Sequence, residues 1–230
     1  MEIRILQLID GAKKAEGLTV IIDVFRAFSV ACYTFGRGVK RHIPVGEVNF
    51  ARKLKEENND YILVGERNGI TLPGFDFGNS PTQIIGADLS DRTVVHTTTA
   101  GTQGIVNANR AEEIITGSFV NASAIIRYIK QRNPKIVSLV CMGYAYEDEA
   151  EEDVLCAEYI KSALEGKVLD HNEIKERLRQ DAGKRFFQPE SQGWAPEGDF
   201  DLCLDFNRFN FILRAEKNDD GLFYLRKIDI

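Results

Sequence analysis

Short runs of β-branched and apolar residues alternate with segments of helical length along the first two-thirds of the chain. Such alternation is typical of an α/β domain, in which helices cover both faces of a largely parallel sheet. Several runs are continuously apolar, which suits strands buried on both faces. The sequence therefore predicts a layered α/β/α fold around a mostly parallel mixed sheet. The predicted strands are 3–8, 19–23, 42–45, 61–64, 93–96, 113–116 and 136–141, and the predicted helices are 26–35, 47–57, 102–108, 122–131, 147–164 and 171–180.

The last part of the chain has a different pattern. Residues 209–216 and 222–227 flank an Asn-Asp-Asp-Gly turn and predict a β-hairpin. The hairpin could edge the sheet or join a second subunit of a homodimer, and the sequence does not choose between these. We expect one domain over residues 1–230, with 117–135 as the place where a subdivision would fall.

Composition excludes several partners. The net charge is -6 and no basic run is present, which argues against nucleic acid. The longest apolar runs are far shorter than the ~20 residues that span a bilayer, so no membrane partner is expected. No secretory signal is evident, and a cytoplasmic location is the resulting expectation. The cysteines are far apart and predict reduced core residues: Cys32, Cys141, Cys156 and Cys203.

A glycine-rich stretch, residues 65–81, follows the predicted strand 61–64. It contains four glycines, the carboxylates of Glu66 and Asp76 and the guanidinium of Arg67. Glycines lose the most conformational freedom on folding, so an ordered loop of this kind suggests close backbone approach to an anion or a metal. An ordinary surface connection is the alternative. We favour a functional loop because long structureless connections inside compact domains are usually functional.

Polar residues also follow other predicted strands. Asp23 ends strand 19–23 and Arg26 comes one helical turn later; they could bind a metal and a phosphate, or Asp23 could cap the helix and pair with Arg26. The run 97–102, Thr-Thr-Thr-Ala-Gly-Thr, could cradle a phosphate or serve only as a helix N-cap. In doubly wound sheets, ligands bind outside the carboxyl ends of the strands, where we expect these residues to meet.

The helix predicted at 147–164 begins with a cluster of acidic residues, which suits the positive end of a helix dipole. A solvated acidic face is one interpretation. However, Asp153 and Glu149 continue the apolar stripe of the helix, and a buried carboxylate needs a partner. Mg²⁺ is one candidate partner, and Arg26 or Arg67 is another.

Four segments in the same order extend this pattern over residues 23–157. They are Asp23-Val-Phe-Arg-Ala-Phe-Ser, Gly65-Glu-Arg-Asn-Gly with Gly74-Phe-Asp-Phe-Gly-Asn-Ser-Pro, Thr97-Thr-Thr-Ala-Gly-Thr, and Glu152-Asp-Val-Leu-Cys-Ala. Together they resemble the 2-phosphosulfolactate phosphatase family, magnesium-dependent phosphatases of sulfolactate and coenzyme M chemistry. Ala100 departs from the resemblance, since many relatives have asparagine there.

The resemblance implies a Mg²⁺-dependent phosphatase that hydrolyses a small anionic 2-phospho acid, with (R)-2-phospho-3-sulfolactate as the expected substrate. A binding or regulatory protein without turnover is the alternative. Either metal-activated water or an aspartyl-phosphate at Asp23 fits phosphoryl transfer. The candidate residues are Asp23, Arg26, Arg67 and Asp76 for catalysis; Asn79, Ser80, Thr98, Thr99, Gly101 and Thr102 for substrate binding; and Asp23, Glu66, Asp76 and Asp153 for Mg²⁺.

Residues 183–198 read as a loop or a lid, from which Lys184 and Arg185 could reach an anion. The histidines His42, His96 and His171 show no pairing in the sequence and are assigned no role.

Overall fold

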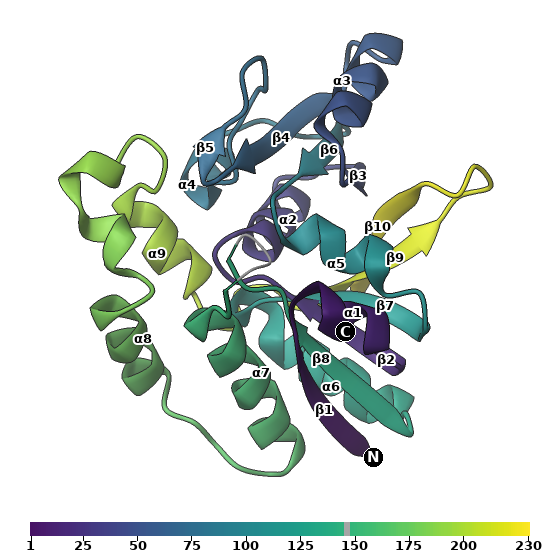
Figure 1. The fold of residues 1–230 in the computed structure, drawn as a ribbon, viewed down its shortest axis with the longest axis vertical. Helices are drawn as coiled ribbons and strands as arrows, with labels where there is room; N and C mark the ends of the chain where they lie inside the picture. Colours follow the sequence, from purple (N-terminus) through teal and green to yellow (C-terminus); the bar gives the residue numbers. More distant parts are fainter. Residues whose placement is uncertain (145–147) are drawn as a thin grey trace.

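A computed structural model describes residues 1–144 and 148–230. Its centre is one ten-stranded mixed sheet with the strand order β1-β8-β2-β7-β9-β10-β3-β6-β4-β5 (Figure 1). All seven strands predicted in the first two-thirds of the sequence are present, and only β5 was missed. The strands are β1 (Glu2–Gln7), β2 (Gly17–Ile22), β3 (Arg41–Pro44), β4 (Ile62–Arg67), β5 (Ile70–Thr71), β6 (Thr93–Thr97), β7 (Ala111–Gly117), β8 (Ile136–Cys141), β9 (Phe211–Lys217) and β10 (Phe223–Asp229).

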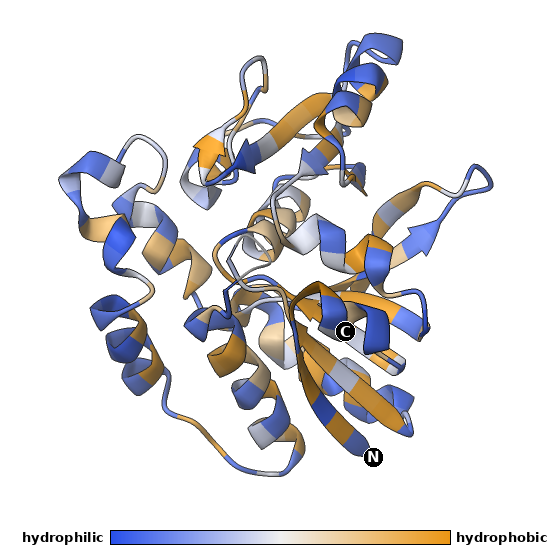
Figure 2. Cartoon of the chain, in the orientation of Figure 1, coloured by the Kyte–Doolittle hydropathy of each residue, from blue (hydrophilic) through white to orange (hydrophobic). Residues whose placement is uncertain are grey.

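Helices cover the sheet on both faces, as the alternation predicted. Successive side chains of a strand point to opposite faces, and in β2 Val20 and Ile22 pack into one apolar cluster while Ile21 packs into another. Figure 2 shows mostly hydrophobic strands and largely hydrophilic surface helices α3 and α8. The α-helices are α1 (Leu8–Lys14), α2 (Ala27–Gly36), α3 (Val48–Glu57), α4 (Pro81–Ile85), α5 (Gly101–Asn107), α6 (Ala122–Arg132), α7 (Glu151–Leu164), α8 (His171–Gln180) and α9 (Glu197–Cys203).

The C-terminal hairpin lies inside the sheet. β9 pairs with β7 and β10 pairs with β3, both antiparallel, so the predicted hairpin joins two parallel groups of strands. One group is β1, β8, β2 and β7, and the other is β3, β6 and β4. The sequence left the place of the hairpin open, because strand partners distant along the chain leave no local signal.

This placement determines how the carboxyl ends of the strands can meet. Three successive antiparallel pairings separate β7 from β3, so the two parallel groups run in opposite directions along the sheet. The carboxyl ends of the two groups can meet only if the sheet curves through the hairpin. Figure 1 shows the two groups at an angle to each other, with α2 and α5 between them.

The elements that the sequence missed are short. Helix α1 has seven residues, and α4 has five, starting at Pro81 behind the N-cap Ser80, whose Oγ accepts a hydrogen bond from the Gln83 amide. The predicted helix 147–164 begins at Glu151 in the structure, and Glu147 lies outside the described residues. The four cysteines are buried and free. In the described part of the chain, no helix is long and apolar enough to cross a membrane.

Candidate active site

A pocket lies where chain segments leave the carboxyl ends of β2, β4, β6 and β8. Its volume is about 40 Å³, room for a few water molecules. The pocket is lined by Asp23, Phe25, Arg26, Glu66, Gly69, Asn79, Thr99, Ala100, Gly143, Tyr144, Arg185 and Trp194.

Asp23 directly follows β2 and is buried. Its Oδ1 accepts a hydrogen bond of 2.9 Å from the Ala27 amide at the start of α2. The pairing with Arg26 that the capping alternative included is not formed, because Arg26 pairs with Asp199. Burial raises the pKa of Asp23 to about 7, with the nearby carboxylates of Glu66 and Glu152 adding to the shift. Capping and a site role are thus compatible, because the same carboxyl group faces the pocket.

Asp153 and Glu152 come from the first turn of α7, and both are buried. Asp153 accepts hydrogen bonds from the amides of Val24 at 2.8 Å and Gly143 at 3.0 Å, which fixes α7 against the ends of β2 and β8. Burial raises the pKa of Asp153 well above its usual value, and Asp23 and Glu152 raise it further. The inward position predicted for Asp153 is therefore confirmed.

Glu149 does not share that inward position. It is exposed because it precedes α7 rather than forming part of the helix.

Glu66 reaches the pocket from the end of β4. Its carboxylate accepts hydrogen bonds from the Thr99 amide at 2.7 Å, the Thr99 hydroxyl at 3.1 Å and the Gly69 amide at 2.7 Å. These bonds tie the glycine-rich loop to the turn between β6 and α5. The loop is therefore ordered by the chain's own polar groups.

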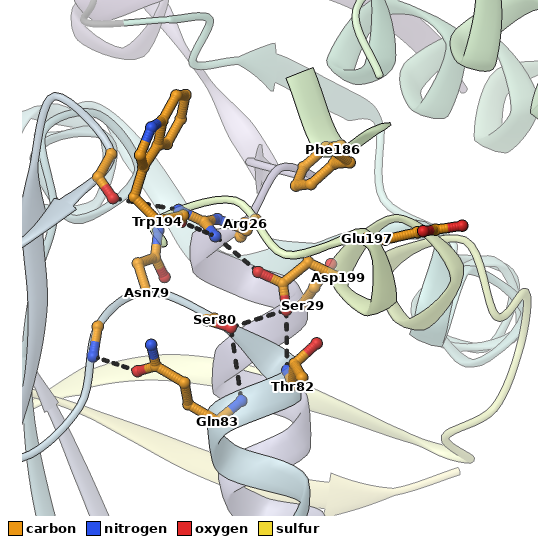
Figure 3. Close-up of polar contacts among 12 residues, drawn as sticks. Arg26, Ser29, Asn79, Ser80, Thr82, Gln83, Phe186, Trp194, Glu197 and Asp199 are labelled. Atoms are coloured by element: carbon orange, nitrogen blue, oxygen red, sulfur yellow. Dashed lines mark hydrogen bonds and ion pairs between the residues drawn. The ribbon is translucent and has the colours of Figure 1, made fainter. Parts of the chain in front are cut away.

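The two arginines of the pocket differ in their partners. Arg26 is 5% exposed and donates to Asp199 Oδ2 at 2.6 Å and to the Trp194 carbonyl at 2.7 Å (Figure 3). Arg185 is 23% exposed and lies 3.3 Å from Glu152 Oε1. Arg26 is thus held by the protein, and Arg185 is the cation more accessible to an anion.

The turn before α5 contributes mainly backbone. Thr98 and Thr102 exchange hydrogen bonds with each other, so neither hydroxyl is directed at the pocket lining. Gly101 packs so tightly that an added Cβ would lie 2.6 Å from Asp23 Oδ2 and 2.9 Å from Ala27 Cβ. Thr99 and Ala100 line the pocket. The polar turn is therefore beside the site, as predicted, while its hydroxyls mostly stabilise the turn.

Some predicted site residues lie elsewhere. Asp76 accepts from the Leu63 amide at 2.8 Å and pairs with Lys55 at 3.7 Å, near the other end of β4. Arg67 donates to the Gly46 carbonyl and to Thr97 Oγ1, each at 3.0 Å. Neither side chain lines the pocket. Adjacent strand residues point to opposite faces, which explains why Glu66 enters the pocket and Arg67 does not.

The loop's last two polar residues have distinct surroundings. Ser80 donates to Asp199 Oδ1 at 2.8 Å and so supports the Arg26–Asp199 pair (Figure 3). Asn79 lines the pocket and lies 3.2 Å from His96 Nε2. His96 in turn contacts His42, a pairing that the sequence did not reveal because the two residues are 54 positions apart.

The sequence pattern assigned no role to Glu152, Trp194 or Asp199, and for Arg185 it indicated only that the side chain could reach an anion. Glu152 could have been predicted, because it belongs to one of the four segments that carry the family resemblance and directly precedes the candidate Asp153. Arg185 and Trp194 belong to the segment read as a loop or lid, which packs as short 3-10 helices, Lys184–Phe187 and Pro189–Ser191. Their approach to the pocket depends on packing between distant segments.

The donors of this site suit Mg²⁺. As they lie, no three carboxylate, imidazole or thiol groups among residues 1–144 and 148–230 form a metal-ligand cluster. However, Asp23, Glu152 and Asp153 are buried acids whose pKa values are raised mainly by burial, and Glu152 adds to the shifts of Asp23 and Asp153. Glu152 Oε2 is buried without a hydrogen-bond partner in the described structure. A hard cation with oxygen ligands would compensate for these groups.

A wider groove of about 720 Å³ lies along β7 and β9. Its charges pair with each other: Glu113 is 3.4 Å from Arg214 and 3.5 Å from Arg132. The groove therefore lacks buried acids such as Asp23 and Glu66, which line the smaller pocket.

The chain is similar to known proteins over most of its length. A family model described as 2-phosphosulpholactate phosphatase matches residues 3–218. The Bacillus subtilis (strain 168) protein named "Probable 2-phosphosulfolactate phosphatase" is 33% identical over 207 residues, 88% of this chain and 89% of that protein. Proteins of the same name from Thermoplasma volcanium (32% over 201 residues, 86% and 90%) and Pseudothermotoga lettingae (35% over 192 residues, 81% and 82%) are similar over most of their length. The chain therefore belongs to the 2-phosphosulfolactate phosphatase family.

Proposed function

We propose that this protein is a Mg²⁺-dependent phosphatase that hydrolyses (R)-2-phospho-3-sulfolactate to 3-sulfolactate and phosphate. The observation that carries the proposal is the meeting of buried acids from three segments, Asp23, Glu66 and the pair Glu152–Asp153, beside Arg185. Family membership supports the substrate class. Three anionic groups on one small acid require positive charge, and this pocket supplies it through Arg185 and a cation.

Asp23, Glu66, Glu152 and Asp153 are the residues that would hold Mg²⁺. When bound, Mg²⁺ neutralises phosphoryl oxygens and lowers the pKa of water. We leave Asp76 and Arg67 out of the proposed site because their side chains bond elsewhere. Thr99 remains a proposed substrate-binding residue because it lines the pocket, and Asn79, which also lines it, would contact either the substrate or the attacking water.

Each side chain of the pocket would have a separate role in the reaction. Arg185 would bind the phosphate or another anionic group of the substrate and leave its contact with Glu152. Water attacks phosphorus, the bond from phosphorus to the C2 oxygen breaks, and that oxygen takes a proton. Without the metal, burial raises the pKa of Asp23 to about 7. As a ligand of Mg²⁺ it would be ionised, so its role would be to hold the metal. Arg26 would position Trp194 and Gly69 around the pocket.

The direct test is phosphate release from a panel of phosphorylated 2-hydroxy acids, with Mg²⁺ and after complete chelation. We expect the highest kcat/KM for (R)-2-phospho-3-sulfolactate, a lower value for 2-phospholactate, which lacks the sulfonate, and no turnover without Mg²⁺. Activity that survives chelation would contradict the metal dependence. Thermal stabilisation by the phospho acids without turnover would instead identify a binding protein. Acid quenching in single turnover would trap phosphate on Asp23 if the reaction is covalent.

Gly101→Ala is expected to reduce activity by displacing Asp23. The new methyl group would lie 2.6 Å from Asp23 Oδ2, in a buried site where it can be accommodated only by movement. Overpacking typically costs about 1–3 kcal/mol of stability, and a misplacement of about 1 Å can reduce rate about 10²-fold. The control is Gly86→Ala, where an added Cβ has no neighbour within 4 Å. Equal kcat/KM in the two variants would show that the position of Asp23 is unimportant.

A further inference from the structure

A series of hydrogen-bonded, buried side chains leads from the pocket to helix α2. Asn79 Oδ1 lies 3.2 Å from His96 Nε2, His96 Nδ1 lies 3.2 Å from His42 Nε2, and His42 Nδ1 lies 3.0 Å from Thr34 Oγ1. All four side chains are buried. The two imidazoles connect the pocket residue Asn79 to Thr34 on the buried side of α2. The proposed function assigns them no role.

The donor and the acceptor of each hydrogen bond in this series follow from counting protons, starting at Thr34. Its hydroxyl lies 2.7 Å from the Ala31 carbonyl. A carbonyl can only accept, so the single hydroxyl proton of Thr34 is used there. At the 3.0 Å contact Thr34 Oγ1 must therefore accept from His42 Nδ1–H.

The same count fixes the remaining contacts, provided that both imidazoles are neutral. A neutral imidazole has one donor and one acceptor nitrogen. His42 Nε2 then accepts from His96 Nδ1–H, and His96 Nε2 accepts from the amide of Asn79. Oxygen and nitrogen of a side-chain amide have nearly the same outline, so hydrogen bonds decide their assignment. The group of Asn79 that faces His96 is therefore its NH₂.

Burial supports the neutral state of both rings. It lowers the pKa of His96 to about 3 and that of His42 well below its usual value, and the proximity of His96 lowers the latter further. In the described structure, the ring nitrogens contact the neutral groups of Thr34 and Asn79 and each other. An imidazolium is thus disfavoured at both positions near neutral pH.

We infer that His42 and His96, anchored on Thr34, are positioning residues that hold the Asn79 carbonyl oxygen toward the pocket. Asn79 then offers an acceptor to a hydrogen-bond donor in the pocket, instead of a donor to an anion. Under the proposed function, on which only this last step rests, the phosphate, sulfonate and carboxylate of the substrate are acceptors. Water in the pocket is the donor that Asn79 would orient.

Histidine tautomers in the resting protein test this inference without any turnover. Long-range proton–nitrogen correlation spectra of protein labelled with ¹⁵N-histidine distinguish Nδ1–H from Nε2–H in each ring. We expect Nδ1–H for both His42 and His96, with His171, which is less buried and bonded to Tyr159, as an internal reference. An Nε2–H tautomer for His96, or an imidazolium at either position, would overturn the inference even if the phosphatase proposal is correct.

A matched pair of variants tests the consequence for the pocket. Thr34→Val removes the anchoring oxygen with little change in shape, whereas Thr34→Ser keeps it. We expect Thr34→Val to produce Nε2–H signals for the two rings and to lower kcat about 10-fold, as loss of an outer positioning partner typically does, with little change in KM. Thr34→Ser should retain the Nδ1–H signals and kcat. Unchanged tautomers in Thr34→Val would rule out Thr34 as the anchor, and changed tautomers with unchanged kcat would rule out the proposed positioning of Asn79.

Discussion

Replacing Asp23 with asparagine is expected to lower kcat by roughly 10²- to 10⁴-fold, the range associated with losing one positioned catalytic group. The carboxyl group lies at the end of β2, beside Gly101 and among the other buried acids. Asparagine keeps the size and one oxygen of the side chain but removes the charge that would bind Mg²⁺. The measurement is phosphate release under saturating Mg²⁺ and substrate.

The same substitution is expected to stabilise the metal-free protein, and to do so more at high pH. The pKa of Asp23 is raised to about 7 by burial and by its acidic neighbours, above the ordinary value of about 3.9. An acid with a raised folded-state pKa destabilises the fold when it must ionise. That destabilisation is absent below about pH 4, grows as pH rises, and is complete above about pH 7. Asp23→Asn removes it.

Urea unfolding with chelator at pH 5 and pH 8 measures this effect. The gain in unfolding free energy of Asp23→Asn over the natural protein should be larger at pH 8, and comparing the two pH values cancels any pH-independent loss of hydrogen bonds. Asp10→Asn is the control, because the Asp10 side chain is 82% exposed. A gain that is equal at both pH values would contradict the raised pKa. Retained activity in Asp23→Asn would remove Asp23 from the proposed site.

Asp199→Ala is expected to destabilise the protein by about 3–5 kcal/mol, the usual consequence of breaking a buried ion pair from one side. Arg26 and Asp199 are 5% and 0% exposed and lie 2.6 Å apart. Asp199 also accepts 2.8 Å hydrogen bonds from the Ser80 hydroxyl and the Thr82 amide, so it connects α9 to α4 (Figure 3). Alanine would leave the guanidinium of Arg26 buried without its counter-ion.

Equilibrium unfolding in urea measures the loss of unfolding free energy in Asp199→Ala. Two further variants show whether the buried charge is its cause. Asp205→Ala breaks an exposed pair with Arg208 at 2.7 Å and should cost no more than about 1 kcal/mol. The double variant Arg26→Met with Asp199→Leu removes both charges and should recover much of the stability lost in Asp199→Ala. If Asp199→Ala were as mild as Asp205→Ala, the pair would not hold the 183–198 segment against the pocket.

The local pattern of this sequence was enough to place most of its regular structure. Continuous apolar runs marked the strands because buried parallel strands need apolar side chains on both faces, and the helix 171–180 was predicted with the bounds it has. Short elements such as α1, α4 and β5 were not predicted, because a few residues are too short a stretch to show a periodic spacing of apolar side chains. Asp23, Glu66 and Asp153 were recognisable from charge placed next to apolar strands or within an apolar helical stripe.

The sequence by itself thus determined the layered α/β fold, the family and the acids from which a phosphatase site is proposed. Only the tertiary structure decided that the hairpin joins two oppositely directed groups of strands, that Arg185 rather than Arg67 faces the acids, and that Asp76 bonds elsewhere. It also placed His42 and His96 in contact. The physical reason is that strand direction and side-chain contacts between distant segments depend on which surfaces pack together, and packing is a property of the whole chain.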